Sequence, residues 1–146
     1  MKQLFNIDKL DTKEIQLIAH NLLLGATVTG RGVLWFTAQE LVLRDSPLYA
    51  ALHTVMPIWV WGLIAMVTGL ILLLSSFHVT SMETSLKYYY YSCIGGLSSS
   101  VFYFFMVVAS LNNAINWLTP YNFLLLTVWT GIVGFIGGAE IYARRK

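Results

Sequence analysis

Four long apolar stretches constrain the fold of this 146-residue chain more than any other feature. A helix needs about 20 residues, at a rise of 1.5 Å each, to cross a hydrocarbon core of about 30 Å. The stretches that reach this length are residues 15–36, 57–77, 88–110 and 121–143. Composition agrees, because only 11% of the residues are charged, against about 25% in soluble domains. The sequence therefore predicts an all-α integral membrane protein, in which a single domain over residues 1–146 forms a bundle of four transmembrane helices.

The distribution of basic residues predicts which way the spans run. Lys and Arg near span ends concentrate on the cytoplasmic side of a membrane. If residues 15–36 span, the external loop 37–56 receives only Arg44, and the opposite side receives most of the nine basic residues. The basic residues on that opposite side are Lys2, Lys9, Lys13, Lys87, Arg144, Arg145 and Lys146. We therefore expect a multi-pass protein of the cell membrane with both termini cytoplasmic.

Four helix starts can be located from capping residues. Thr80 with Glu83 and Thr119 before Pro120 mark the starts of the last two spans, by the same spacings as the two starts that follow. Asp11 and Glu14 have the spacing of a capping box and place the start of the first helix. Ser46 before Pro47 predicts a short helix over about residues 47–56. The residues on one face of that helix are Leu48, Leu52, Val55 and Met56. We expect this amphipathic segment to lie along the outer membrane surface.

Arg31 is the least expected residue of the first span. It lies five residues before Phe36, between Gly30 and Gly32, and an unpaired charge in hydrocarbon is strongly unfavourable. One interpretation is that its side chain extends outward to lipid phosphates. The other is that it faces the interior of the bundle or of an oligomer and pairs with a carbonyl or an acid, such as Glu40 or Asp45. The tilt of Cα–Cβ bonds toward the helix N-terminus disfavours the outward direction, and both interpretations stay open.

His20 and Asn21 are polar residues in the other half of the same span. A histidine in a membrane helix either relays protons or forms an interhelical hydrogen bond. No acidic residue lies within any span except Glu140 at the edge of the last one. The sequence therefore favours the hydrogen-bonding role for both residues.

Small residues recur on the third and fourth spans. The candidates for close helix packing are Gly95, Ser99, Gly131, Gly134 and Gly138. Gly134 and Gly138 form a GxxxG pair, which allows two helix backbones to approach closely. Such residues either pack helices within one chain or mediate self-association. The sequence leaves both roles open. Small residues occur on all four spans, which is more than packing within one bundle needs and favours self-association as well.

Several classes of function find no support in the sequence. Paired carboxylates, a metalloprotease motif, a phosphate-binding loop, and a nucleophile with a plausible base are missing. Cys93 is the single cysteine and has no His or Cys at metal-ligand spacing. The net charge of +2 is too small to suggest a nucleic-acid partner. We therefore expect no enzymatic activity, no metal and no cofactor, and the lipid bilayer is the one partner that composition implies.

One segment resembles a known group of proteins. The Arg31–Gly32 pair, the helix start SPLY at 46–49 and the span that begins near Trp61–Gly62 are similar to small membrane proteins of phages and prophages of Gram-positive bacteria, some of which are holins. The resemblance covers residues 31–77 and implies a bacterial cytoplasmic membrane. The chain departs from the usual holin pattern because it lacks a strongly charged, extended C-terminal tail. Its four spans and outer amphipathic segment also look like DoxX-type membrane proteins, without a matching motif.

Two functions of different class follow from these observations. The first is a holin-like protein that oligomerises in the cytoplasmic membrane and permeabilises it. The second is a non-lytic, membrane-embedded binding or assembly subunit that acts through its outer loop 37–56 and takes a protein partner there. No predicted helix has a continuous hydrophilic stripe that could line a pore.

Overall fold

The computed structural model describes residues 11–79 and 86–146, so the predicted cytoplasmic residues Lys2 and Lys9 lie outside the described part. These residues form six helices and no strand. The helices are α1 (Thr12–Thr37), α2 (Gln39–Asp45), α3 (Pro47–Val55), α4 (Ile58–Ser76), α5 (Leu86–Asn113) and α6 (Leu118–Ala143). Four of them, α1, α4, α5 and α6, are long and apolar enough to cross a membrane. The chain is therefore an all-α membrane bundle, as its hydropathy predicts.

Two of the four predicted helix starts are confirmed. The Asp11 carboxylate accepts a hydrogen bond from the Thr12 amide at 2.7 Å, and the Glu14 carboxylate accepts one from the Asp11 amide at 3.0 Å. At the second start, the Ser46 hydroxyl accepts a hydrogen bond from the Leu48 amide at 3.3 Å. These contacts satisfy amides that a helix N-terminus leaves without an intrahelical partner. The expectation at Thr119 was wrong, because α6 begins at Leu118, whose amide donates a hydrogen bond to Asn116 Oδ1 at 3.1 Å. Thr80 and Glu83 lie outside the described residues.

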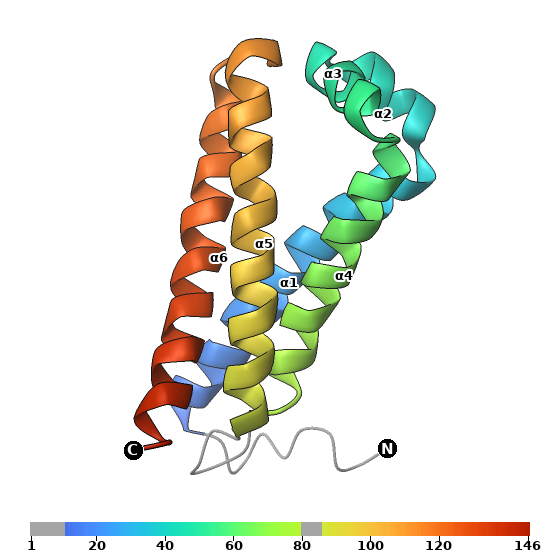
Figure 1. The fold of residues 1–146 in the computed structure, drawn as a ribbon. Coiled ribbons are helices and arrows are strands. Elements are labelled where there is room, and N and C mark those ends of the chain that lie inside the picture. Colours follow the sequence, from blue (N-terminus) through green and yellow to red (C-terminus); the bar gives the residue numbers. More distant parts are fainter. Residues whose placement is uncertain (1–10, 80–85) are drawn as a thin grey trace.

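The four long helices pack as two antiparallel pairs, α1 with α4 and α5 with α6, and the pairs are inclined to one another (Figure 1). Glycines permit the close approach within each pair. A Cβ atom added to Gly69 of α4 would lie 2.5 Å from the Thr29 amide nitrogen of α1, and one added to Gly96 of α5 would lie 2.6 Å from the Gly134 amide nitrogen of α6. Close van der Waals contact between backbones therefore contributes to the packing within each pair, in addition to the buried side chains of the core.

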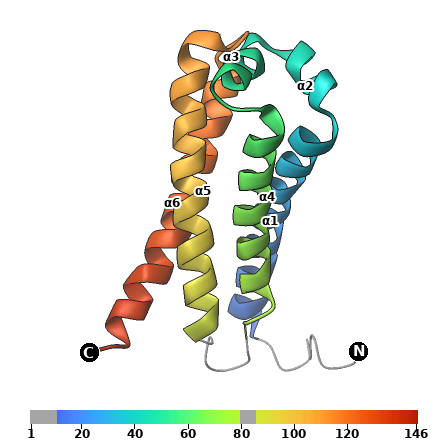
Figure 2. The same cartoon turned by 45° about the vertical axis from the view of Figure 1, so that its right-hand side comes forward.

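The segment between the first two spans was only partly predicted. Helix α1 ends at Ala38, whose backbone has φ −112° and ψ 45°, and α2 follows at once as a separate helix of seven residues. Helices α2 and α3 lie together at one end of the bundle, opposite the end where α1 begins and α6 finishes (Figures 1 and 2). We call this the α2–α3 end.

Helix α3 packs on the bundle through half of its predicted apolar face. Leu48 and Leu52 are buried in the hydrophobic core, whereas Val55 is 77% exposed. The Trp61 indole of α4 donates hydrogen bonds to the Leu52 and Met56 carbonyl oxygens, at 3.2 and 3.1 Å. These contacts fix α3 over the end of α4 and position the residues that α3 adds to the site described next.

Candidate functional site

Arg31 of α1 faces the interior of the bundle. It is half-buried and lies six positions before the end of α1 at Thr37, a distance of about 9 Å along the helix. Its guanidinium carbon lies 5.2 Å from the centroid of the Phe123 ring of α6 and 6.0 Å from that of the Tyr103 ring of α5. A guanidinium within about 6 Å of a ring centroid is attracted by the ring quadrupole. Two aromatic rings of the other helix pair thus hold this charge.

The expected acidic partner of Arg31 is not found. Within the described residues Arg31 forms no ion pair with a carboxylate and no hydrogen bond to a protein acceptor, so pairing with Glu40 or Asp45 was the wrong expectation. The break at Ala38 explains why Glu40 does not pair with Arg31. Helix α2 starts in a new direction after Ala38 and places Glu40 in a separate pocket at the elbow between α1 and α2. Asp45, at the end of α2, lines a cavity together with Arg31 but lies outside ion-pair distance.

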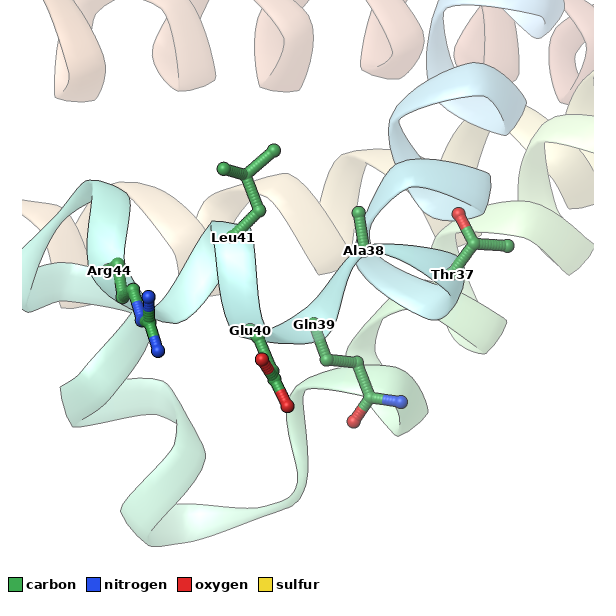
Figure 3. Close-up of a pocket in the computed structure, with 6 residues that line it drawn as sticks. All are labelled: Thr37, Ala38, Gln39, Glu40, Leu41 and Arg44. Atoms are coloured by element: carbon green, nitrogen blue, oxygen red, sulfur yellow. The ribbon is translucent and has the colours of Figure 1, made fainter.

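The elbow pocket has a volume of about 680 Å³ and is open to the surroundings. Figure 3 shows Gln39 and Glu40 on the same side of the elbow, with Leu41 pointing away from them. The lining residues are Thr37, Ala38, Gln39, Glu40, Leu41 and Arg44. All of them come from one continuous stretch of chain, and neither Arg31 nor any residue of α4, α5 or α6 contributes. The pocket is therefore a bend in the chain rather than a site assembled by the fold.

A second cavity, the cap cavity, lies beneath α2 and α3 and has a volume of about 280 Å³. Its lining residues are Arg31, Leu34, Trp35, Val42, Asp45, Tyr49, Thr119, Asn122 and Phe123. They come from α1, α2, α3 and α6, so only the folded bundle assembles it. The cavity combines one cation, one anion, and the neutral polar groups of Tyr49, Thr119 and Asn122.

Both charges of the cap cavity act on Tyr49. Burial raises the pKa of the Tyr49 hydroxyl above its usual value; the positive charge of Arg31 opposes this rise, and the negative charge of Asp45 adds to it. The Tyr49 ring packs against Trp35, with a distance of 5.6 Å between ring centroids. The α3 tyrosine is therefore close enough to both charges to feel them, and an aromatic contact with α1 holds its ring in the cap cavity.

A third cavity, the lateral cavity, continues from the cap cavity along α1 and α6 and has a volume of about 610 Å³. Its lining residues are Thr27, Arg31, Asn122, Leu125, Leu126, Val128, Trp129 and Ile132. Arg31 and Asn122 line both cavities and form the junction between them. A chamber that contains two charged side chains thus adjoins a mainly apolar one. The volume of the lateral cavity lies within the roughly 300–1,000 Å³ of small-molecule sites, and that of the cap cavity lies just below this range.

His20 and Asn21 both make interhelical hydrogen bonds. The Trp129 indole of α6 donates to Nε2 of His20 at 2.8 Å, which links α1 to α6. Asn21 is 1% exposed, and its amide nitrogen lies 2.9 Å from the Ser75 hydroxyl of α4 and 3.1 Å from the Ser92 hydroxyl of α5. The Tyr88 hydroxyl is 3.2 Å from the same nitrogen. These contacts tie α1 to the other three long helices.

The small residues predicted from sequence meet other parts of the same chain. A Cβ atom on Gly95 would lie 2.9 Å from the Leu72 amide nitrogen, and one on Gly134 would lie 2.6 Å from the Leu97 amide nitrogen. Gly131 faces Ser100, Gly138 faces the Cys93 sulfur, and Ser99 is fully buried. The close approaches therefore serve packing within one chain, and a role for these residues in an oligomer stays a prediction.

Sequence reasoning missed most of the cavity residues. Asn122 was detectable, since a polar amide inside an apolar stretch is unusual. Phe123, Tyr49 and Trp129 were not, because aromatic residues near span ends are ordinary features of membrane proteins. Only their position around Arg31 distinguishes them.

The arrangement offers binding contacts rather than reactive groups. Within the described ranges no cluster of three or more His, Cys, Asp or Glu residues could hold a metal ion. The junction instead offers guanidinium donors, an amide and an adjacent apolar chamber. Comparison with protein-family models, curated proteins and solved structures finds no significant match for this chain.

Proposed function

We propose that this chain is a non-lytic, membrane-embedded binding protein whose site is the joined cap and lateral cavities. The observation that carries this proposal is the junction at Arg31 and Asn122, where a chamber with two charged side chains meets a mainly apolar one. An ionisable residue held within a membrane bundle is by default a candidate for function. The outer loop contributes Asp45 and Tyr49, which agrees with the expectation that it takes part in binding.

The distribution of polar groups also supports binding. Asn21, Ser75, Ser92 and Thr130 are buried in the bundle, and the outward faces of the long helices expose large apolar side chains. Those exposed on α6 outside the lateral cavity are Leu118, Tyr121, Leu124, Phe135, Ile136 and Tyr142. Such faces suit contact with lipid and do not suit the lining of an aqueous pore.

Photo-crosslinking from the lateral cavity tests the proposed function. Leu125 and Leu124 are neighbours on α6 and are each 47% exposed, but only Leu125 lines the cavity. With a photoreactive benzophenone residue at position 125, we expect one defined adduct that survives purification in mild detergent. The same residue at position 124 should give only the adducts of bulk lipid. Identical adduct patterns at both positions, by intact-mass spectrometry, would reject the lateral cavity as a binding site.

A permeabilising, holin-like oligomer is the second candidate. Its support is the phage-protein resemblance together with an outward-facing pair of small residues on α1, Ala26 and Gly30. Both are exposed, and nothing lies within 4 Å of a Cβ atom placed on Gly30. The two functions differ in one measurement, the uptake of a membrane-impermeant dye after induced expression in bacteria. Non-lytic binding predicts no uptake above an empty vector, whereas dye entry that Gly30→Leu abolishes would favour the oligomer.

The proposed orientation places both termini in the cytoplasm and the α2–α3 end outside. Its support is the position of three basic residues at the end of the bundle opposite α2 and α3. Lys13 lies at the start of α1, and Arg144 and Arg145 directly follow α6. In a Cys93→Ser background, we expect a membrane-impermeant thiol reagent to label Ser46→Cys in intact cells and to label Arg145→Cys only after lysis. Labelling of position 145 but not 46 in intact cells would invert the topology.

A further inference from the structure

The cap cavity contains one positive and one negative side chain that do not pair with each other. Arg31 and Asp45 both line it, and neither forms an ion pair within the described residues. We propose that its occupant is the headgroup of a zwitterionic phospholipid that carries a phosphate and an ammonium group. This inference rests on the proposed function, since it names the ligand class of the same site.

Arg31 supplies the phosphate contact. Its guanidinium contacts the Phe123 and Tyr103 rings, and among residues 11–79 and 86–146 its N–H groups have no protein acceptor. A guanidinium presents its donors as a planar fork that matches two phosphate oxygens. Arg31 also lies only about 9 Å from the end of α1. A lipid phosphate drawn slightly below the surface of its leaflet would therefore meet the guanidinium at this depth.

Asp45 supplies the contact for the ammonium group. It is the last residue of α2, at the α2–α3 end, and it is exposed. A headgroup with only negative charge would bring its phosphate close to this carboxylate, and like charges in one cavity repel. A headgroup that carries both charges instead matches Arg31 with its phosphate and Asp45 with its ammonium. Charge complementarity thus selects a zwitterion over an anion.

The lateral cavity accommodates the apolar part of the same molecule. Below the junction its lining is mainly Leu125, Leu126, Val128 and Ile132, which suits an acyl chain. Trp129 and Ile132 line this chamber and also a further cavity of about 380 Å³ near Lys13, and the hydrogen bond from Trp129 to His20 crosses from α6 to α1 at that boundary. The site therefore has a charged end and an apolar end, which is the pattern of one amphiphile.

Lipid selectivity tests the inference. The full chain is reconstituted in nanodiscs with equal parts of phosphatidylethanolamine, phosphatidylglycerol and phosphatidylcholine, and bound lipid is identified by native mass spectrometry after release into detergent. We expect the wild type to retain phosphatidylethanolamine over phosphatidylglycerol by at least about tenfold, because Asp45 repels the anionic lipid. Asp45→Asn should shift retention toward phosphatidylglycerol, and Arg31→Gln should lose both lipids. Glu40→Gln and Arg44→Gln, which remove charges from the elbow pocket, should leave the ratio unchanged.

The outcomes separate this inference from the proposed function. The zwitterion assignment is wrong if the wild type retains phosphatidylethanolamine and phosphatidylglycerol equally, or if Asp45→Asn does not change their ratio. Binding at the cavity still holds in that case, provided that position 125 gives its defined adduct. A defined adduct that is a protein also overturns the lipid assignment alone. If position 125 gives no defined adduct, the proposed function itself is rejected. Added inorganic phosphate should not displace the lipid, and displacement would assign the site to a free anion.

Discussion

Gly32→Ala is expected to lower the free energy of unfolding by roughly 1–3 kcal/mol, the range for overpacking in a closely packed interior. A Cβ atom on Gly32 would lie 2.5 Å from the Met66 amide nitrogen and 2.6 Å from the Gly62 carbonyl oxygen of α4. Both are backbone atoms, so no side-chain rotation can relieve the collision, and α1 must move away from α4. The effect should therefore fall at the upper end of the range.

Gly30→Ala is the matched control for this prediction. Gly30 lies two residues earlier on the same helix, and nothing lies within 4 Å of an added Cβ atom. The same substitution there should leave stability unchanged or raise it by up to about 1 kcal/mol, because alanine is the better helix former. Unfolding in mixed micelles titrated with a denaturing detergent measures both variants. Equal midpoints for the two would contradict the α1–α4 interface.

Asn21→Ala is the second substitution with a large expected effect. It removes the amide that lies within hydrogen-bond distance of the Ser75, Tyr88 and Ser92 hydroxyls. Interhelical hydrogen bonds in membranes contribute about 0.6 kcal/mol on average and at most about 1.7 kcal/mol each. Since an asparagine amide has two N–H donors, we expect a loss of about 1–3 kcal/mol, with the cavity left by the side chain included.

Asn112→Ala provides the comparison for Asn21. Asn112 is exposed in the last turn of α5, and surface substitutions usually change stability by less than about 0.5 kcal/mol. Detergent-induced unfolding again gives the free-energy difference. If Asn21→Ala and Asn112→Ala behave alike, the hydrogen bonds among α1, α4 and α5 contribute nothing to stability.

Several features could be predicted from the sequence because they depend on neighbouring residues alone. Hydropathy over about 20 residues locates the four long helices whatever their packing, and the caps at Asp11 and Ser46 are contacts between residues at most three apart. The short helix α2 was not predicted from the sequence. Seven residues are too few for a helix that is stable by itself, so its formation depends on contacts with α3 and the bundle.

The sequence by itself determined that this chain is a helical membrane protein and that Arg31 is its most unusual residue, since both follow from the free energy of placing side chains in hydrocarbon. Only the tertiary structure decided what surrounds that arginine. Tyr103 of α5 and Phe123 of α6 lie more than 70 positions after Arg31 in the chain. Asn122 completes the junction of the two cavities. The relative rotation of two glycine-packed helix pairs sets which residues share a cavity, and no local pattern encodes that rotation.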